Sequence, residues 1–340
     1  MIASELAPIG RTSLKVTRLG FGTAPLGGFR GAIPDEEAAA TLAAAWTDGV
    51  RYFDTAPYYG YGRSELRLGG MLRDKPRDEF VLSTKVGRWM EPLGNSELPG
   101  DLKRGGLPFM PRFDYSAAGT TRTLEQSMMR LGLSRIDIVY IHDVDVFTHG
   151  TAEAADLRYR EAMEGCYPEL ERLRDDGVIG AIGVGLNETE RSLRFAKEAD
   201  IDCILLAGRY TLLEQEPLDE LLPVCIEKSI NVVLGGPYNS GVLATGTGVG
   251  ASFDYGAVPP AVEKRVGRLQ KAAAAHGISL ISAALQFPLA HPAVASVVPG
   301  AMSRIEQEAN AAALDETIPV AFWDALREQG LLRADAPTPT

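Results

Sequence analysis

The order of elements in this sequence predicts a closed α/β barrel of eight strands, the (β/α)8 or TIM barrel, in one domain. Short apolar runs alternate with helical segments about eight times along residues 1–340, which favours a closed barrel over an open sheet. We find no interdomain linker and no internal repeat, and 340 residues suit a single barrel. We expect an ordered core over about 9–330 and a disordered tail at 334–340.

The first half of the chain supplies a hairpin and four strands. Residues 9–17, with Leu14 and Val16 alternating with polar residues, predict a small β-hairpin that caps the bottom of the barrel. Pro34 followed by three acidic residues suits the first turn of a helix. Two long loops are expected above the carboxyl ends of the strands, at 86–115 and 143–157. The expected strands are 19–23, 50–54, 80–85 and 136–142, and the expected helices are 34–48, 63–72 and 117–131.

The second half supplies the other four strands. They are expected at 178–184, 203–207, 231–234 and 294–298. Two capping boxes, Asn187 with Glu190 and Ser303 with Glu306, each predict the start of a helix. The second of these helices runs to about 313, and a last amphipathic helix follows at 317–329. Residues 235–258, rich in Gly, Pro, Ser and Asn, form a third long loop.

Composition excludes several classes of function. The net charge of −11, without a basic block, argues against nucleic-acid binding, which needs a Lys and Arg footprint. No stretch reaches the about 18 apolar residues of a membrane helix. The start of the chain has neither the basic residues nor the apolar run of a signal peptide. Three scattered cysteines, Cys166, Cys203 and Cys225, read as reduced core residues. We therefore expect a cytoplasmic protein with a small-molecule partner, as a monomer or a homodimer.

Three successive apolar runs end in residues that can carry chemistry. The first ends at Asp54, with Tyr59 shortly after it in the turn Asp54–Gly60; the next two end at Lys85 and His142. Each residue alone is an ordinary polar side chain at a strand end. Since the carboxyl ends of barrel strands converge on one face, all four should meet there. A phenol has a pKa of about 10, and a nearby cation lowers it by roughly 1–3 units.

These four residues resemble the catalytic tetrad of the aldo-keto reductase superfamily. The shared signature is Asp-Thr-Ala-x-x-Tyr-Gly, then Ser-Thr-Lys, then a strand that ends in His, and the resemblance runs from about Leu14 to Asn310. It implies direct hydride transfer between a substrate carbon and a nicotinamide, with no metal. Tyr59 would exchange the hydroxyl proton and Lys85 would lower its pKa. Asp54 would orient Lys85, and His142 would hydrogen-bond the reacting oxygen.

Two glycine-rich segments are candidates for holding a dinucleotide. Residues 246–251 match the G-x-G-x-x-A fingerprint, but they have no strand directly before them and no helix after them. The loops after strands seven and eight are the usual anion site of a barrel, and the second leads into a helix N-terminus. Either is also readable as an ordinary turn, and the resemblance implies that they hold the cofactor. The candidate cofactor-binding residues are Gly22, Thr23, Asp54, Asn187, Gly236, Pro237, Tyr238, Asn239, Ser240, Gly241, Gly300, Ala301, Met302, Ser303, Arg304 and Asn310.

The sequence departs from the superfamily where the nicotinamide is held. The usual Ser-Asn pair falls at residues 185–186, which are Gly and Leu, and Asn187 is the candidate substitute. The usual strand-six Gln falls at Ala207, and the usual stacking Tyr at Gly236. The phrases at 206–213 and 236–241 are similar to a branch with L-fucose (D-threo-aldose) 1-dehydrogenases and pyridoxal 4-dehydrogenases. Oxidation of a sugar at C1 to its lactone is therefore predicted; the alternatives are oxidation of pyridoxal to 4-pyridoxolactone and general aldehyde or ketone reduction.

NAD is the predicted cofactor, with NADP as the alternative. In NADP-dependent members of the superfamily a Lys and an Arg bind the 2′-phosphate, and here these positions are Gly300 and Glu306. A carboxylate would repel that phosphate. Arg304 is the one basic residue nearby, and it would bind phosphate only if it turned inward. Glu306 also has a simpler reading as the capping partner of Ser303.

We expect Tyr58, Trp89 and His142 to contact the substrate. The aromatic residues of the first long loop, Trp89, Phe109, Phe113 and Tyr115, either line the pocket or anchor the loop. Two rival functions remain open. A metal hydrolase would use His142, Asp143, Asp145 and His149, although no other strand end offers a His. A dinucleotide-binding regulatory subunit would keep the four residues without turnover.

Overall fold

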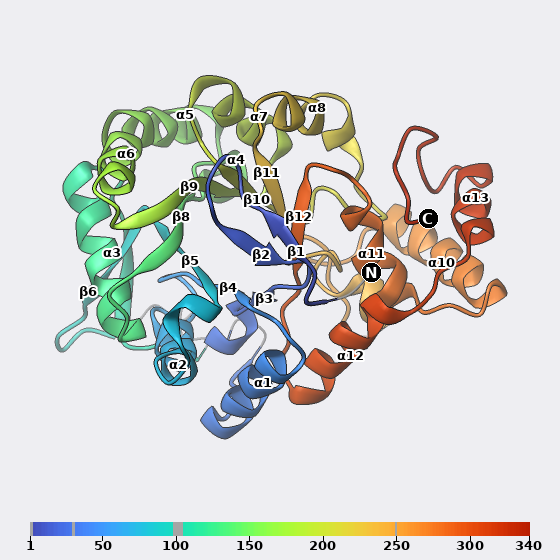
Figure 1. The fold of residues 1–340 in the computed structure, drawn as a ribbon, viewed down its shortest axis with the longest axis horizontal. Coiled ribbons are helices and arrows are strands. Elements are labelled where there is room, and N and C mark those ends of the chain that lie inside the picture. The colour runs from blue at the N-terminus through green and yellow to red at the C-terminus, as the bar shows by residue number, and fades with distance from the viewer. Residues whose placement is uncertain (1–2, 29–30, 98–104, 249) are drawn as a thin grey trace.

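The computed structural model describes residues 3–28, 31–97, 105–248 and 250–340, and among them eight parallel strands form a central barrel. Figure 1 shows this barrel in the middle of the molecule. The sheet closes because the first strand meets the last: Gly20 N donates to Val297 O at 2.8 Å and Gly22 N donates to Pro299 O at 3.0 Å. The predicted barrel is therefore confirmed. In sheet order the strands are β3 (Phe21–Gly22), β4 (Tyr52–Asp54), β5 (Val81–Val86), β8 (Ile136–His142), β9 (Ile179–Leu186), β10 (Cys203–Ala207), β11 (Asn231–Gly235) and β12 (Val294–Val298).

Helices surround the strands, as Figure 1 shows. Apolar side chains on their inner faces pack against the buried strands, and burying these two surfaces against each other is what stabilises the layered barrel. The helices are α1 (Asp35–Thr47), α2 (Arg63–Leu72), α3 (Ala117–Leu131), α4 (Val146–His149), α5 (Ala152–Glu161), α6 (Tyr167–Asp175), α7 (Thr189–Glu198), α8 (Leu221–Glu227), α9 (Val242–Thr245), α10 (Pro260–Ala275), α11 (Leu280–Leu289), α12 (Arg304–Asp315) and α13 (Val320–Glu328).

A hairpin closes one end of the barrel, as predicted. Strands β1 (Leu6–Pro8) and β2 (Lys15–Thr17) pair antiparallel and lie across the barrel axis in Figure 1. Ile9 and Val16 of this hairpin are buried, and they pack on apolar side chains of the barrel interior such as Ile138 and Val233. The hairpin seals the amino ends of the strands, so the carboxyl ends are left for a site.

The first long loop is more regular than predicted. Within 86–115, strands β6 (Arg88–Pro92) and β7 (Phe109–Phe113) form an antiparallel pair, with Arg88 opposite Phe113. The expectation of an irregular segment was therefore wrong at both of its ends; residues 98–104 lie outside the described residues. The pair lacks the alternation of apolar and polar residues that marks a strand, because arginines and prolines interrupt it. The prediction of a loop at 143–157 was also wrong, since this segment contains α4 and the start of α5.

Two predictions at helix ends had different outcomes. Ser303 caps α12, because its Oγ accepts a hydrogen bond from Glu306 N at 3.2 Å. The Asn187 capping box was wrong: α7 begins at Thr189, and the Asn187 backbone N–H donates instead to Asp145 Oδ2 at 2.8 Å. A nearby carboxylate outside the helix is a better acceptor for that group than the local helix end.

The chain end was expected to be disordered, and this was wrong. Ala336 is buried, and Arg327 donates hydrogen bonds to Ala336 O at 3.1 Å and to Thr338 Oγ1 at 2.9 Å. The tail therefore packs against α13 and extends the fold past residue 330.

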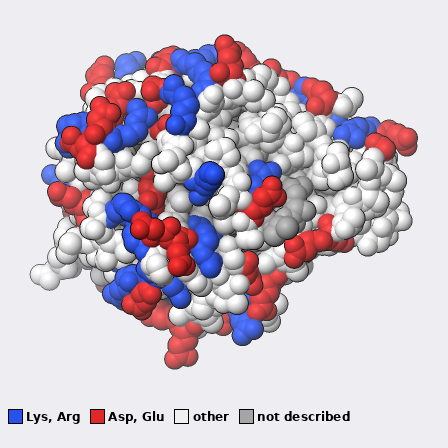
Figure 2. Space-filling model, in the orientation of Figure 1, with Lys and Arg blue, Asp and Glu red and all other residues white. Residues whose placement is uncertain are grey.

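The remaining compositional predictions concern cysteines, membranes and surface charge. The three cysteines are buried and unpaired, as predicted for core residues. Among the described residues no single helix is long and apolar enough to cross a membrane, and only the sharply bent pair α10 and α11 passes a length and composition test together. Figure 2 shows acidic and basic side chains interspersed over the visible face.

Candidate active site

A buried ion pair lies at the carboxyl ends of β4 and β5. Lys85 Nζ donates to both carboxylate oxygens of Asp54, at 2.8 and 2.7 Å, and to Thr55 O at 2.8 Å. Ser83 Oγ donates to the same carboxylate at 2.7 Å. The exposed fractions of Lys85 and Asp54 are only 1% and 3%. Three acceptors match the three donors of the ammonium, so its orientation is fixed.

Tyr59 and His142 lie directly beside this pair. Lys85 Nζ is 4.9 Å from the centre of the Tyr59 ring. The Tyr59 and His142 rings are 6.2 Å apart at 88° to each other. The structure therefore brings together Asp54, Tyr59, Lys85 and His142, which the sequence places on three different strands and one turn.

The pKa of Tyr59 is shifted in the direction opposite to the expected one. Burial raises the pKa of its phenol well above 10, and the Asp54 carboxylate adds to that rise. Arg88 is the cation that lowers the pKa of Tyr59, whereas the Lys85 ammonium is committed to Asp54 and Thr55. That Lys85 lowers this pKa therefore stays a prediction: its ammonium lies 4.9 Å from the ring centre, and its hydrogen bonds go to Asp54 and Thr55. A protonated phenol, ready to donate a proton, is the resting form.

His142 is neutral at physiological pH. Burial lowers the pKa of its imidazole well below 6.5, and the charges of Arg88 and Lys85 lower it further. The ring is also close to a carboxylate, with Nε2 at 3.4 Å from Asp143 Oδ1. A neutral imidazole has one N–H donor and one acceptor nitrogen, so it suits a hydrogen bond to an oxygen that changes charge.

Sequence reasoning missed Arg88, which lines one cavity together with Tyr59, Lys85 and His142. It favoured the next residue, Trp89, but successive side chains of a strand point to opposite faces. Trp89 lies outside the residues that line the two cavities described below, and the Arg122 guanidinium of α3 lies 4.7 Å from its ring centre. Recognition of β6 as a strand, starting three residues after Lys85, would have been the signal.

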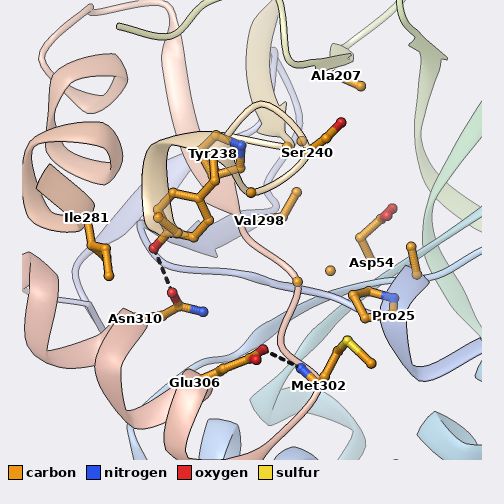
Figure 3. Close-up of a pocket in the computed structure, with 18 of the residues that line it drawn as sticks. Pro25, Asp54, Ala207, Tyr238, Ser240, Ile281, Val298, Met302, Glu306 and Asn310 are labelled. Carbon is orange, nitrogen blue, oxygen red and sulfur yellow. Dashed lines mark hydrogen bonds between the residues drawn. The ribbon is translucent and has the colours of Figure 1, made fainter. Parts of the chain in front are cut away.

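A first cavity of about 320 Å³ extends from Tyr59 toward α12 (Figure 3). Its wall comes mainly from the two glycine-rich segments predicted to hold the cofactor, and close packing requires glycine at two points. A Cβ at Gly300 would lie 2.5 Å from Pro25 Cγ, and one at Gly22 would lie 2.8 Å from Val298 O. The candidate cofactor residues that line it are Gly22, Asp54, Gly236, Pro237, Tyr238, Ser240, Gly241, Gly300, Met302 and Asn310.

Polar groups are concentrated at the end of this cavity away from Asp54 (Figure 3). Tyr238 OH donates to Asn310 Oδ1 at 2.6 Å, and the buried Asn310 Nδ2 has no hydrogen-bond partner among the described residues. Glu306 lines the cavity and accepts from Met302 N at 2.8 Å. A buried donor without a partner favours a ligand with a hydrogen-bond acceptor there, so this end fits a polar group of a dinucleotide.

Six candidate cofactor residues do not line this cavity, and one of them, Asn187, lines the second cavity described below. Thr23 and Ala301 are buried, and Thr23 Oγ1 donates to Asp54 O at 2.9 Å. Asn239 is buried and donates to Gly208 O at 3.0 Å. Ser303 caps α12. Arg304 points outward, with 66% of its side chain exposed and its Nε donating to Glu308.

A second cavity of about 330 Å³ adjoins the first at Tyr59. Tyr58, His142 and Asn187 line it, as do Lys85 and Arg88. Tyr59 also lines the first cavity, so a ligand in one cavity would meet a ligand in the other beside the Tyr59 phenol. A cofactor in the first and a substrate in the second would place their reacting atoms at Tyr59 and His142.

The residues of the rival metal site are engaged elsewhere. Asp143 pairs with Arg88, and Asp145 caps α4 by accepting from Thr148 N at 3.0 Å. Over the described ranges, no group of three or more His, Cys, Asp or Glu side chains is arranged to hold a metal ion.

Comparison with known proteins gives the same family as the sequence signature. The model of the aldo/keto reductase family matches residues 18–329. Pyridoxal 4-dehydrogenase from Microbacterium luteolum is 41% identical over 340 residues, covering 97% of this chain and 98% of that protein. D-threo-aldose 1-dehydrogenase from a Pseudomonas species is 39% identical over 340 residues, covering 96% of each. A solved aldo-keto reductase from Bacillus halodurans has the same fold, with a TM-score of 0.73 and 23% identity over 98% of both chains.

Proposed function

The chain belongs to the aldo/keto reductase family, and from that premise we propose that it oxidises an aldose of the L-fucose or D-threo type at C1 to the lactone with NAD. Enzymes of this family are oxidoreductases that use NAD(H) or NADP(H). One observation carries the proposal: the enclosed Lys85–Asp54 pair lies beside Tyr59 and His142 at the point where the two cavities meet.

The proposed chemistry assigns one task to each side chain. In oxidation, Tyr59 in its phenolate form takes the proton of the C1 hydroxyl while the C1–H bond breaks and a C=O bond forms. When bound, the nicotinamide supplies the acceptor for the hydride from C1. Neutral His142 donates a hydrogen bond to the reacting oxygen. Asp54 holds Lys85, whose charge then stabilises the phenolate. Since burial raises the pKa of Tyr59, oxidation should accelerate toward alkaline pH.

The proposed preference for NAD is supported by what already occupies the start of α12. The backbone N–H of Arg304 donates to Glu37 Oε1 at 3.2 Å, and that of Met302 donates to Glu306. Two carboxylates thus accept from backbone N–H groups at a helix N-terminus that could otherwise bind a phosphate. No Lys or Arg is among the described residues that line this cavity. The nearest candidate, Arg304, faces away.

Asn187 is the proposed contact for the nicotinamide amide. Its side-chain Nδ2 lies 3.4 Å from Asp143 Oδ1 and from Asp145 Oδ2, so the amide is oriented at the wall of the second cavity. Tyr238 does not take the place of the usual stacking tyrosine, because its hydroxyl bonds Asn310 at the far end of the first cavity. We assign Tyr238 and Asn310 to the adenosine half.

A substrate screen tests this proposal. Absorbance of the reduced nicotinamide is followed with NAD and NADP over a panel of aldoses, pyridoxal and simple aldehydes. Fastest oxidation of an aldose with NAD is the expected result. Pyridoxal as the best substrate would support the second candidate, which the 41% identity to a pyridoxal 4-dehydrogenase favours. Reduction alone would indicate a general reductase, and cofactor binding without turnover would indicate a regulatory subunit.

A further inference from the structure

The second cavity holds a buried arginine that the chemistry above does not use. Only 6% of Arg88 is exposed. Its guanidinium carbon lies over two aromatic rings, 4.3 Å from the centre of Tyr58 and 4.4 Å from that of Phe113. Such stacking fixes a guanidinium in one orientation.

Most hydrogen-bonding capacity of this arginine remains available. Its Nη1 donates to Asp143 Oδ2 at 2.5 Å and lies 3.5 Å from His142 Nδ1. Among the described residues, the side-chain hydrogen bonds of Arg88 to protein are those of Nη1, and Nε and Nη2 are left for a ligand. A guanidinium has five N–H donors, and donors held at a cavity wall favour a ligand with an oxygen acceptor.

The carboxylate beside it also has spare capacity. Asp143 lines the cavity, and its Oδ1 has only long contacts at 3.4 Å, to Asn187 Nδ2 and to His142 Nε2. Its backbone is in the left-handed region, with φ of 54°, and is held there because Tyr115 OH donates to Asp143 O at 3.1 Å. A non-glycine residue kept in this conformation at a cavity wall indicates a functional demand on its side chain.

We propose that Arg88 and Asp143 together bind a hydroxyl on the carbon next to the reacting carbon, and so select substrates that carry one. This inference rests on the proposed function, since His142 marks the reacting oxygen. Asp143 Oδ1 is 3.4 Å from His142 Nε2, and Arg88 Nη1 donates to the other oxygen of the same carboxylate, so the pair lies next to the oxygen that His142 would bind. A hydroxyl accepts from Arg88 and donates to Asp143 at the same time.

The same pair separates the two substrate classes. The C2 hydroxyl of an aldose satisfies both groups. Pyridoxal has no hydroxyl on the carbon next to its reacting carbon; its phenolate oxygen, one carbon further on, can accept from Arg88 but meets the negative charge of Asp143. The pair therefore favours the sugar.

The test measures kcat/KM with NAD for an aldose and for its 2-deoxy analogue, using the full chain. In the wild-type protein the aldose should be preferred. Arg88→Met should reduce that preference by about 10- to 100-fold, the value of a hydrogen bond to a charged group. Asp143→Asn should reduce it as well, and should raise the use of pyridoxal relative to the aldose.

Arg112→Met is the matched control. Arg112 lies on the same hairpin, is exposed and pairs with Glu91 at 2.7 Å, so its loss should leave the preference unchanged. Arg88→Lys keeps the charge next to Asp143 without the planar donors, and it should show a partial loss. If Arg88→Met does not fold, Arg88→Lys and Asp143→Asn decide the question.

The outcomes separate this inference from the proposed function. A wild-type protein that oxidises neither sugar with either cofactor overturns the proposed function. A wild-type protein that oxidises both sugars equally overturns the role of Arg88 and Asp143 alone. Equal losses on both sugars in the variants would also overturn it, because they would show that Arg88 only supports His142.

Discussion

The two cavities that meet at Tyr59 are lined by different kinds of residue. The first is lined mainly by Gly, Pro, Ala and aliphatic side chains, and its charged side chains are Asp54 at one end and Glu306 at the other. The second has Lys85, Arg88, His142 and Asp143 within one wall. This composition favours recognition by shape and backbone groups in the first cavity, and by charged side chains that pair with one another in the second.

This difference decides what a substitution should do in each region. The shape of the first cavity depends on backbone conformation. The backbone at Asn239, Ser240 and Gly241 is in the left-handed region, with φ of 46°, 60° and 102°. The fixed charges of the second are buried, so removal of one partner leaves the other without compensation. Changes in the first region should therefore alter which cofactor binds, and changes in the second should alter turnover and stability.

The largest effect is expected at the junction. Tyr59→Phe removes the proton carrier and keeps the ring in its place, so kcat should fall by about 100- to 10,000-fold. The dissociation constant for NAD should change little, because the first cavity is intact. Stopped-flow turnover and cofactor titration measure the two quantities. Activity within a few-fold of the wild type would show that Tyr59 is not the proton carrier.

The next effect is on stability. Lys85→Met leaves the Asp54 carboxylate buried without its cation, and the free energy of unfolding should fall by about 3–5 kcal/mol. Denaturant unfolding measures this, and the double variant with Asp54→Asn should recover part of the loss. Lys197, which pairs with Glu220 at the surface, is the control. Lys197→Met should cost no more than about 1 kcal/mol. Equal costs for the two single variants would contradict the contrast between buried and exposed pairs.

The parts of the fold that follow periodic patterns were predictable. Helix α2 at 63–72 and strand β8 at 136–142 have the predicted bounds, since continuous apolar runs and amphipathic repeats extend over each. The meeting of Asp54, Lys85, His142 and the turn residue Tyr59 was predictable because parallel strands bring their carboxyl ends to one face.

The second cavity was less predictable, because it depends on long-range contacts. The register of β6 and β7 decides that Arg88, and not Trp89, faces the cavity, and no local pattern fixes that register. Asn187 was assigned to a helix cap because the sequence does not show that Asp145, 42 residues before it, accepts its N–H. The pKa of Tyr59 was expected to fall because charge alone was considered, whereas burial dominates.

A smaller effect is expected in the first cavity. Glu306→Ala removes the carboxylate that would face a 2′-phosphate, and the preference for NAD over NADP in kcat/KM should fall by about fivefold or more, from a repulsion of about 1 kcal/mol or more at 4 Å. Glu308→Ala releases the outward-facing Arg304, and it should leave that ratio unchanged. If Glu308→Ala instead raised the use of NADP as much as Glu306→Ala does, Arg304 would be a phosphate-binding residue.

The smallest effect concerns the charge state of His142, and it tests whether the charges of the second cavity act on one another. Burial, Arg88 and Lys85 lower the pKa of His142, and Asp145 raises it. The ring should therefore show no titration near pH 6.5 by NMR, with its signal assigned by its absence in His142→Gln. Between the lowered pKa and 6.5 the unfolded chain binds this proton and the folded chain does not. The free energy of unfolding should then fall as the pH falls below 6.5.

Arg88→Met removes one of the two cations that lower this pKa, so the titration of His142 should move up toward 6.5. Arg112→Met should not move it, because that guanidinium is exposed on the far strand of the hairpin. An unchanged His142 titration in Arg88→Met would mean that the charge of Arg88 does not help to keep the ring neutral. The second cavity would then be a set of separate ion pairs, and its contrast with the first would be one of composition only.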